Sequence, residues 1–355
     1  MARLSRVELQ RRNRQNVLAA ARAEFAERGY RGAKVDQVAE RAGLTRGAVY
    51  SNFPGKRALY FAVLAELAEQ ARPPAHPDLG HDLREALGAF ARAWMGRSVP
   101  DAEAAGLARD LYAEVLDDER VRRPFAGLLT LDAIVLGLAL EGLRPGDAEP
   151  VRLVRIAEAA LTTLHGARQL LAAAPGFVEP FTVVEACAEL AAVAITDRWP
   201  PPDAVPPVRP VDLPWDPPDA VDLLRGDTAQ LAGDGVLAVL GLHRLAAIEE
   251  AVRAAPPGVQ VTAVVVTGRP GELMPLARLL VTELGSCLRQ AIPPSAWPRL
   301  QVVCDETGTL AAAADLPAVS DATEAAVRVR AGRLLGCADG RGAGHAVAAG
   351  TPVPR

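Results

Sequence analysis

Residues 45–56 place hydroxyl, amide and basic side chains at spacings that suit contact with DNA. Thr45 stands where a helix would begin, so its hydroxyl and backbone amide could bond a phosphate oxygen. Arg46 could reach a base edge or a phosphate, and arginine on guanine is the commonest specific contact. Gly47 and Ala48 are small, which lets the backbone come close to the groove and lets the alanine methyl touch a thymine methyl.

Four more polar residues follow in the same segment. Tyr50 and Lys56 suit phosphate oxygens, while Ser51 and Asn52 could bond either a base edge or a phosphate. These residue types predict an interface with double-stranded DNA. The alternative is a plain helical bundle with a basic face.

The apolar spacing predicts the helices that would position these side chains. Residues 10–28 repeat apolar residues every four positions, and residues 35–42 give a second, shorter helix. Gly43 supplies a turn, Thr45 caps a third helix over 46–53, and Lys56 opens a fourth, which runs to residue 72. Two short helices joined by a tight turn are typical of a helix-turn-helix.

Charge supports a polyanionic partner for this segment alone. Residues 1–57 contain thirteen Arg and Lys against five Asp and Glu, a local balance of +8. The whole chain of 355 residues has a net charge of −4, so the remainder carries −12. A basic head on an acidic body indicates that the head meets DNA.

The head resembles the N-terminal domain of the TetR/AcrR family. The resemblance rests on FAERGY at residues 25–30, VAERAGLTRGAVYSNF at 38–53, Lys56 and Leu59. It implies a homodimer, usually a repressor, that is released from its operator by a small-molecule effector. A dimer with two helix-turn-helices should bind a palindromic operator. The first residues carry positive charge without an apolar segment behind them, so we expect a cytoplasmic location. The family usually begins its second helix with hydroxyl residues, where this chain has Ala33 and Lys34; Lys34 could contact phosphate instead.

Residues 78–198 read as helical almost throughout and are similar in layout to that family's effector-binding and dimerisation domain. Breaks are expected at prolines, Pro124 among them. The last two predicted helices, 148–173 and 179–197, are apolar enough to pair in a dimer. Plain core packing is the alternative reading for each residue that we expect to contact an effector: Trp94, Tyr112, Phe125, His165 and Arg168.

Nine prolines in residues 199–220 predict an extended linker, and the spacing of the apolar residues changes after it. Valine-rich runs at 236–242, 259–267 and 300–305 read as buried strands, with helices between them and a hairpin over 325–338. Their order resembles a thioredoxin fold. The place of the nucleophilic cysteine after the first of these strands holds Leu242-His243-Arg244, so the thioredoxin reaction is not expected.

The expected architecture is therefore multi-domain. It comprises an all-α helix-turn-helix domain (1–60), a helical effector and dimerisation domain (61–198), the linker (199–220) and a small α/β, thioredoxin-like domain (221–355). We expect no enzyme activity, cofactor or metal site, because Cys187, Cys287, Cys304 and Cys337 form no metal-ligand spacing. No membrane partner is expected either, since the longest apolar run contains Asp132.

Two other functions stay open at this point. One is a thioredoxin-like oxidoreductase or a redox sensor that uses Cys304 or Cys337. The other is a DNA-bound scaffold whose C-terminal domain holds another protein.

Overall fold

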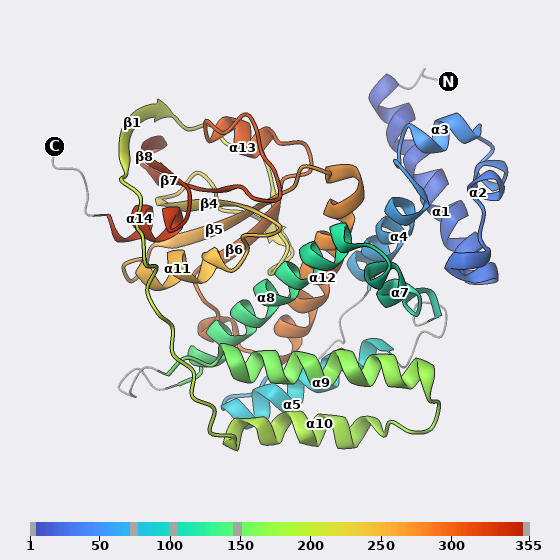
Figure 1. Ribbon diagram of the computed structural model, residues 1–355, viewed down its shortest axis with the longest axis horizontal. Coiled ribbons are helices and arrows are strands. Elements are labelled where there is room, and N and C mark those ends of the chain that lie inside the picture. Colours follow the sequence, from blue (N-terminus) through green and yellow to red (C-terminus); the bar gives the residue numbers. More distant parts are fainter. Residues whose placement is uncertain (1–4, 72–76, 99–105, 145–150, 351–355) are drawn as a thin grey trace.

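A computed structural model describes residues 5–71, 77–98, 106–144 and 151–350 (Figure 1). The described helices of the N-terminal half are α1 (Arg6–Gly32), α2 (Val35–Arg41), α3 (Arg46–Tyr50), α4 (Lys56–Gln70), α5 (Leu83–Ser98), α7 (Leu111–Leu116), α8 (Glu119–Glu141), α9 (Val154–Ala173) and α10 (Pro180–Glu189), with the 3-10 turn η1 (Leu190–Ala192).

The C-terminal half mixes strands with helices. Its strands are β1 (Arg209–Pro214), β2 (Val221–Asp222), β3 (Asp227–Thr228), β4 (Gly235–Gly241), β5 (Gln260–Val266), β6 (Leu300–Cys304), β7 (Glu324–Arg330) and β8 (Arg333–Asp339). Its helices are α11 (Ala247–Ala254), α12 (Pro270–Ala291), η2 (Pro294–Ala296), α13 (Thr309–Ala313) and α14 (Ala343–Ala349).

Apolar residues at helical spacing form the core of the N-terminal domain, as the sequence predicts. Val17, Ala21 and Phe25 are buried on one face of α1, against α4. Val49 and Phe53 are each 1% exposed and hold the α3 segment against the same core. The periodicity of the sequence therefore places the polar residues of α3 on the opposite side.

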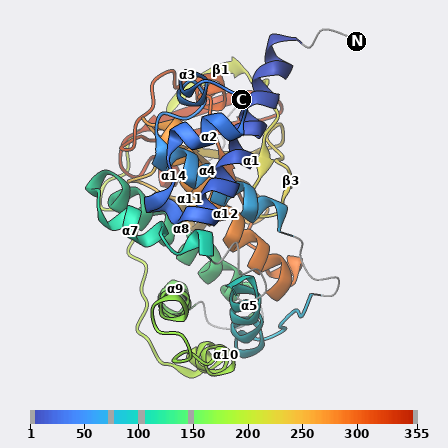
Figure 2. The same ribbon diagram turned by 90° about the vertical axis from the view of Figure 1, so that its right-hand side faces the viewer.

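Helices α5, α8, α9 and α10 make the helical body, and Figure 2 shows α9 and α10 nearly end-on at its lower edge. The expected break at Pro124 is wrong, because Pro124 lies inside α8. Proline has no N–H and leaves the carbonyl four residues earlier without its helical partner. That carbonyl, of Arg120, accepts a hydrogen bond from the Arg269 guanidinium instead.

Helix α8 is, by length and composition, the one described helix apolar enough to cross a membrane. The sequence reading excluded any such run because of Asp132. Most of the apolar window is buried inside the body, where α8 packs against α9 and α12. A core helix of a folded protein satisfies the same criteria.

The main sheet has six strands in the order β1-β8-β7-β4-β5-β6. Strands β4, β5 and β6 are parallel, β7 is antiparallel to β4, and β8 and β1 continue the antiparallel side. The predicted strands at 236–242, 259–267, 300–305 and 325–338 all lie in this sheet within one residue of their expected ends.

Alternate residues of the central strands face two different layers. Val236, Ala238 and Leu240 of β4 pack toward α11, α12 and α14, whereas Leu237 and Val239 pack toward α13 and Trp215. Both faces are covered, which explains why these strands read as continuous apolar runs.

The second half of the predicted linker is folded into this sheet. Residues 209–214 form β1, which pairs antiparallel with β8. The next residue, Trp215, is buried, and its indole N–H donates to the Leu231 carbonyl at 2.7 Å. Proline suits such an edge strand because its missing N–H is not needed for pairing.

Helix α12 belongs to the helical body as much as to the sheet. It packs along α4 and also contacts α5 and α8 (Figure 1). Elsewhere, a Cβ placed on Gly127 of α8 would stand 2.1 Å from the Leu242 carbonyl, so the two parts meet backbone to backbone. One continuous core joins the regions that the sequence suggested as separate helical and α/β domains.

Candidate DNA interface and buried polar cluster

The connection between α2 and α3 is a tight turn. Gly43 has φ of +64°, a conformation that glycine adopts readily because it lacks a Cβ. The Leu44 amide donates to the Ala39 carbonyl at 2.9 Å and closes the turn. Ala39 is buried, and its small side chain lets the two helices approach. This is the helix-turn-helix geometry that the sequence predicts.

Ion pairs hold α2 on α1. Arg41 of α2 donates through Nη1 to Glu27 at 2.8 Å, and its Nε lies 3.3 Å from Glu24. The Glu24 side chain is fully buried and also lies 3.2 Å from Arg28 Nε. A buried carboxylate needs such positive partners, so this network fixes the orientation of α2.

Arg14 of α1 supports the end of α3. Its Nη1 donates to the Asn52 carbonyl at 3.3 Å, and its guanidinium carbon lies 4.4 Å from the centroid of the Phe53 ring. Sequence analysis did not single out Arg14. The only signal was its place on the polar face of the first helix.

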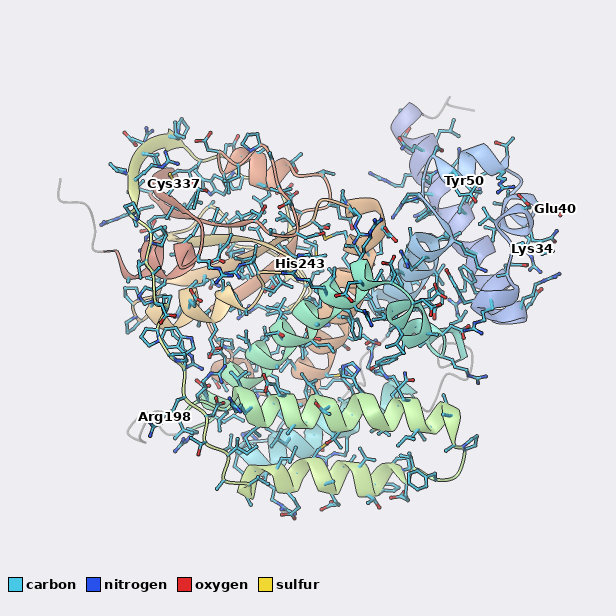
Figure 3. All side chains as sticks on the ribbon, in the orientation of Figure 1. Lys34, Glu40, Tyr50, Arg198, His243 and Cys337 are labelled. Carbon is cyan, nitrogen blue, oxygen red and sulfur yellow. The ribbon has the colours of Figure 1, made fainter. Side chains whose placement is uncertain are left out.

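Six of the nine expected DNA contacts are exposed: Lys34, Thr45, Arg46, Gly47, Tyr50 and Ser51. Figure 3 shows Lys34 at the outer edge of the domain, away from the sheet. Thr45 caps α3 by accepting from the Ala48 amide at 3.2 Å. Arg46 lies 3.3 Å from Asp36 and 5.5 Å from the Tyr50 ring centroid, which keeps its guanidinium on the surface.

The other three expected contacts lie further in. Ala48 is half-buried, and the Asn52 amide nitrogen donates to the Ala48 carbonyl at 2.8 Å. The Lys56 ammonium donates to the Arg31 carbonyl at 3.3 Å and lies 4.5 Å from the Tyr30 ring centroid. Partial burial lowers the pKa of Lys56. In this conformation Asn52 and Lys56 are engaged in contacts within the domain.

All five residues expected to contact an effector lie in one cluster between α5, α7, α8 and α9. The Trp94 and His165 rings are 4.9 Å apart between centroids, and those of Tyr112 and Phe125 are 5.7 Å apart. The Tyr112 hydroxyl is hydrogen-bonded to His165 Nδ1, and the Arg168 guanidinium lies 4.5 Å from the Trp94 centroid.

Helix α12 adds charge to this cluster. Glu283 of α12 accepts from Arg168 Nη1 at 3.2 Å and lies 3.9 Å from Arg97 Nη2. Arg97 also donates to Ser286 Oγ at 3.2 Å. Burial opposes ionisation of Glu283, but Arg168 and Arg97 outweigh it and lower its pKa. The helical body and the C-terminal half thus share one buried ionic network.

Several polar atoms of the cluster have no hydrogen-bond partner in the described structure. They are Trp94 Nε1, Arg97 Nε, Asp132 Oδ1 and Oδ2, His165 Nε2 and Arg168 Nε. Buried polar groups are paired in the great majority of cases, so a set of unpaired ones in one place suggests a site for a bound molecule or water.

The N-terminal region is similar to a family of known proteins. Residues 17–63 match the bacterial regulatory proteins of the tetR family. Residues 17–63 thus form a DNA-binding domain of the tetR family. The transcriptional regulator SrpR of Pseudomonas putida is 41% identical over 80 residues, which are 22% of this chain and 37% of SrpR. The transcriptional repressor AcnR of Corynebacterium diphtheriae is 39% identical over 85 residues, 24% of this chain and 44% of AcnR.

The chain spans less than half the length of these two relatives, so the likeness concerns the DNA-binding domain. FasR of Mycolicibacterium smegmatis, 43% identical over 51 residues (14% of this chain, 23% of FasR), is an activator. Among solved structures, the multidrug binding protein EbrR complexed with imidazole aligns with 52% of this chain and 95% of its own. The TM-score is 0.40 at 23% identity. The curated relatives named here are transcriptional regulators, and each matches only part of this chain.

Sequence analysis missed Arg97, Asp132 and Glu283 in the buried cluster. Asp132 carried a signal, since it is a lone carboxyl in an apolar run. Glu283 carried none, because residues 272–291 read as a helix of a separate domain. Only the packing of α12 into the body brings Glu283 to the arginines.

The cysteines of the described chain are unpaired, and Cys187 and Cys287 are buried. Burial raises the pKa of Cys304 to about 12 and also raises the pKa of Cys337. Figure 3 places Cys337 at the far side of the sheet from the DNA-binding domain. Within the described residues, no three His, Cys, Asp or Glu side chains gather as metal ligands would.

Proposed function

We propose that this chain is a TetR-family repressor that binds a palindromic operator as a homodimer and is released by a small-molecule effector. The observation that carries the DNA-binding part is the exposed face of α3. There Thr45, Arg46, Gly47, Tyr50 and Ser51 lie on the surface of a basic domain. Side chains of these types bond phosphates and base edges.

Lys34 and Lys56 complete the proposed interface, with Ala48 and Asn52 closer to the core. Lys34 is exposed before α2, where its ammonium suits a phosphate oxygen. Lys56 and Asn52 would exchange their internal hydrogen bonds for contacts with DNA, or would keep them and position the turn. Substitution of each residue distinguishes these roles.

The dimer is supported by apolar side chains on α9 and beyond it. Leu170 is exposed near the end of α9, and Phe177 and Phe181 are 74% and 79% exposed at the junction with α10. Several large exposed apolar residues within one short segment are typical of an interaction surface. A second copy that presents the same helices would cover them in a symmetric bundle.

The effector would bind in the cluster of Trp94, Tyr112, Phe125, His165 and Arg168. The unpaired polar atoms of that cluster support a ligand there. The redox alternatives are not favoured, because the raised pKa values of Cys304 and Cys337 leave few thiolates near neutral pH. We propose a cytoplasmic location, in keeping with a DNA-binding role.

The C-terminal half is proposed to be a thioredoxin-like module without the thioredoxin reaction. Its strand order β5-β4-β7-β8, with a parallel first pair and an antiparallel hairpin, supports this assignment. His243, where the nucleophile would stand, lies between the sheet and α8 in Figure 3. A scaffold role would require a partner for the outer surface of the sheet domain, and no observation favours one.

Selection of duplexes from a random DNA pool tests the proposal. The full-length chain is compared with a double variant, Arg46→Ala combined with Tyr50→Ala, and with Arg92→Ala as a control. Arg92 is an exposed arginine of α5 that pairs with Asp78. Enrichment of a palindrome by the wild type and by the control, but not by the double variant, supports the proposal. Equal enrichment by all three contradicts the interface on α3.

A further inference from the structure

The buried cluster between α5, α8, α9 and α12 holds more positive than negative charge. Arg97 and Arg168 bring two guanidinium groups, and both side chains are largely buried. Guanidinium stays protonated in proteins, so both charges are permanent. Among the described residues, Glu283 is the carboxylate that pairs with them. One positive charge is left over.

Asp132 does not balance the second arginine. Its side chain is 1% exposed, and neither carboxyl oxygen has a hydrogen-bond partner. Burial, with a smaller contribution from nearby Glu283, raises the pKa of Asp132 well above its usual range. An unpaired carboxyl in such surroundings takes up a proton and stays neutral.

Three of the unpaired atoms in the cluster are donors. Trp94 Nε1 and the Nε atoms of Arg97 and Arg168 all carry hydrogens without an acceptor. The Arg168 guanidinium also covers the Trp94 ring, so two of these donors belong to side chains in contact. A region with spare donors and excess positive charge complements an anionic acceptor.

We propose that the effector is a small organic acid whose carboxylate binds at Arg97, Arg168 and Trp94, in a site that α12 completes through Glu283. This inference rests on the proposed effector-released function. Two arginines that share one carboxylate leave a positive charge that favours an anion. The aromatic rings around them suit the apolar part of the acid. The C-terminal half thereby sets ligand specificity, since Glu283 limits how much negative charge the site accepts.

The test uses the full-length chain and three acids: benzoate, octanoate and dodecanoate. Each acid is titrated beside the primary amide and the amine of the same skeleton, and binding is followed by calorimetry and by melting temperature. We expect at least one acid to bind about tenfold more tightly than its amide and its amine. Tighter binding of the amide or the amine, or binding of none of the acids, overturns the proposal.

Two variants locate the site. Glu283→Gln removes the competing carboxylate and is expected to tighten binding of the acid about tenfold without changing binding of the amide. Arg168→Met leaves Glu283 paired with Arg97, so no positive charge is in excess, and this variant is expected to abolish the preference for the acid. Arg84→Met is the matched control. Arg84 of α5 forms an exposed ion pair with Glu189 at the end of α10. Unchanged preference in the Arg168→Met variant overturns the site.

DNA release is measured separately, on the selected duplex. An acid that binds without releasing DNA leaves the site in place and contradicts the proposed release mechanism. An acid that releases DNA from the Arg168→Met variant as well as from the wild type overturns the site while keeping the repressor function. The two proposals thus fail in different ways.

Discussion

Arg57 at the start of α4 donates through Nε to Glu272 of α12 at 3.0 Å, a contact between residues 215 positions apart. The same guanidinium donates to Asp118 at 2.8 Å. Near the other end of α4, Glu69 accepts from Arg278 of α12 at 2.9 Å. Helix α12 therefore holds both ends of the helix that leaves the DNA-binding domain.

A chain that ends at residue 198 is expected to lose cooperative thermal unfolding. Without α12, the apolar side chains of α4, α5 and α8 that it covers would face water. Calorimetry and binding of a hydrophobic dye measure this loss. A sharp unfolding transition of the shortened chain, with no dye binding, would show that the helical body folds alone.

Leu280→Ala and Leu284→Ala test the same packing in the full chain. Both leucines of α12 are buried in the shared core, so each substitution is expected to cost about 2–5 kcal/mol of unfolding free energy. Leu213→Ala, on a 39% exposed leucine of edge strand β1, is the matched control and should cost clearly less. Chemical denaturation followed by circular dichroism provides the measurement.

The sequence predicted local elements well because periodicity and turn residues act locally. The stripe of Val17, Ala21 and Phe25 predicted α1, and Gly43 predicted the turn. The valine-rich runs predicted the buried strands within one residue. Each of these signals depends on neighbours a few positions away.

Long-range packing was not predictable in the same way. Nothing in residues 270–291 indicates that Glu283 pairs with Arg168, because that contact depends on how α12 crosses the body. The proline-rich segment hid β1, since edge strands tolerate proline. Asn52 and Lys56 were assigned to DNA by residue type, whereas their hydrogen bonds within the domain follow from the positions of Ala48 and Arg31.

Gly127→Ala is expected to destabilise the chain by about 1–3 kcal/mol. The new Cβ would stand 2.1 Å from the Leu242 carbonyl, so α8 and the sheet would have to separate. Gly96→Ala in α5 has nothing within 4 Å of its new Cβ and should be neutral or slightly stabilising. Equal melting temperatures of the two variants would contradict the close approach of α8 to the sheet.

Arg46→Ala is expected to weaken binding of the selected duplex by roughly 1–3 kcal/mol if the guanidinium reads a base edge. Fluorescence anisotropy with selected and random duplexes measures the loss. Equal losses on both duplexes would instead assign Arg46 to a phosphate, with a shallower dependence of affinity on salt. Asp36→Asn, which frees Arg46 from its 3.3 Å ion pair, should not weaken binding of either duplex.

His165 is expected to make stability fall as the solution becomes acidic. Burial, helped by Arg168, lowers the pKa of His165 from 6.5 to about 4 in the folded chain. The unfolded chain therefore binds the proton first, so stability is lost as pH falls from about 6.5 toward 4. His165→Gln removes this loss, and between pH 7 and pH 4.5 the variant should gain about 2 kcal/mol relative to the wild type.

Asp132→Asn acts in the opposite direction: the raised pKa of Asp132 destabilises the wild type as pH rises, so this variant should gain most at high pH. Denaturation series across that range measure both differences. Parallel curves for wild type and His165→Gln would mean that the pKa of His165 is the same in the folded and unfolded chains.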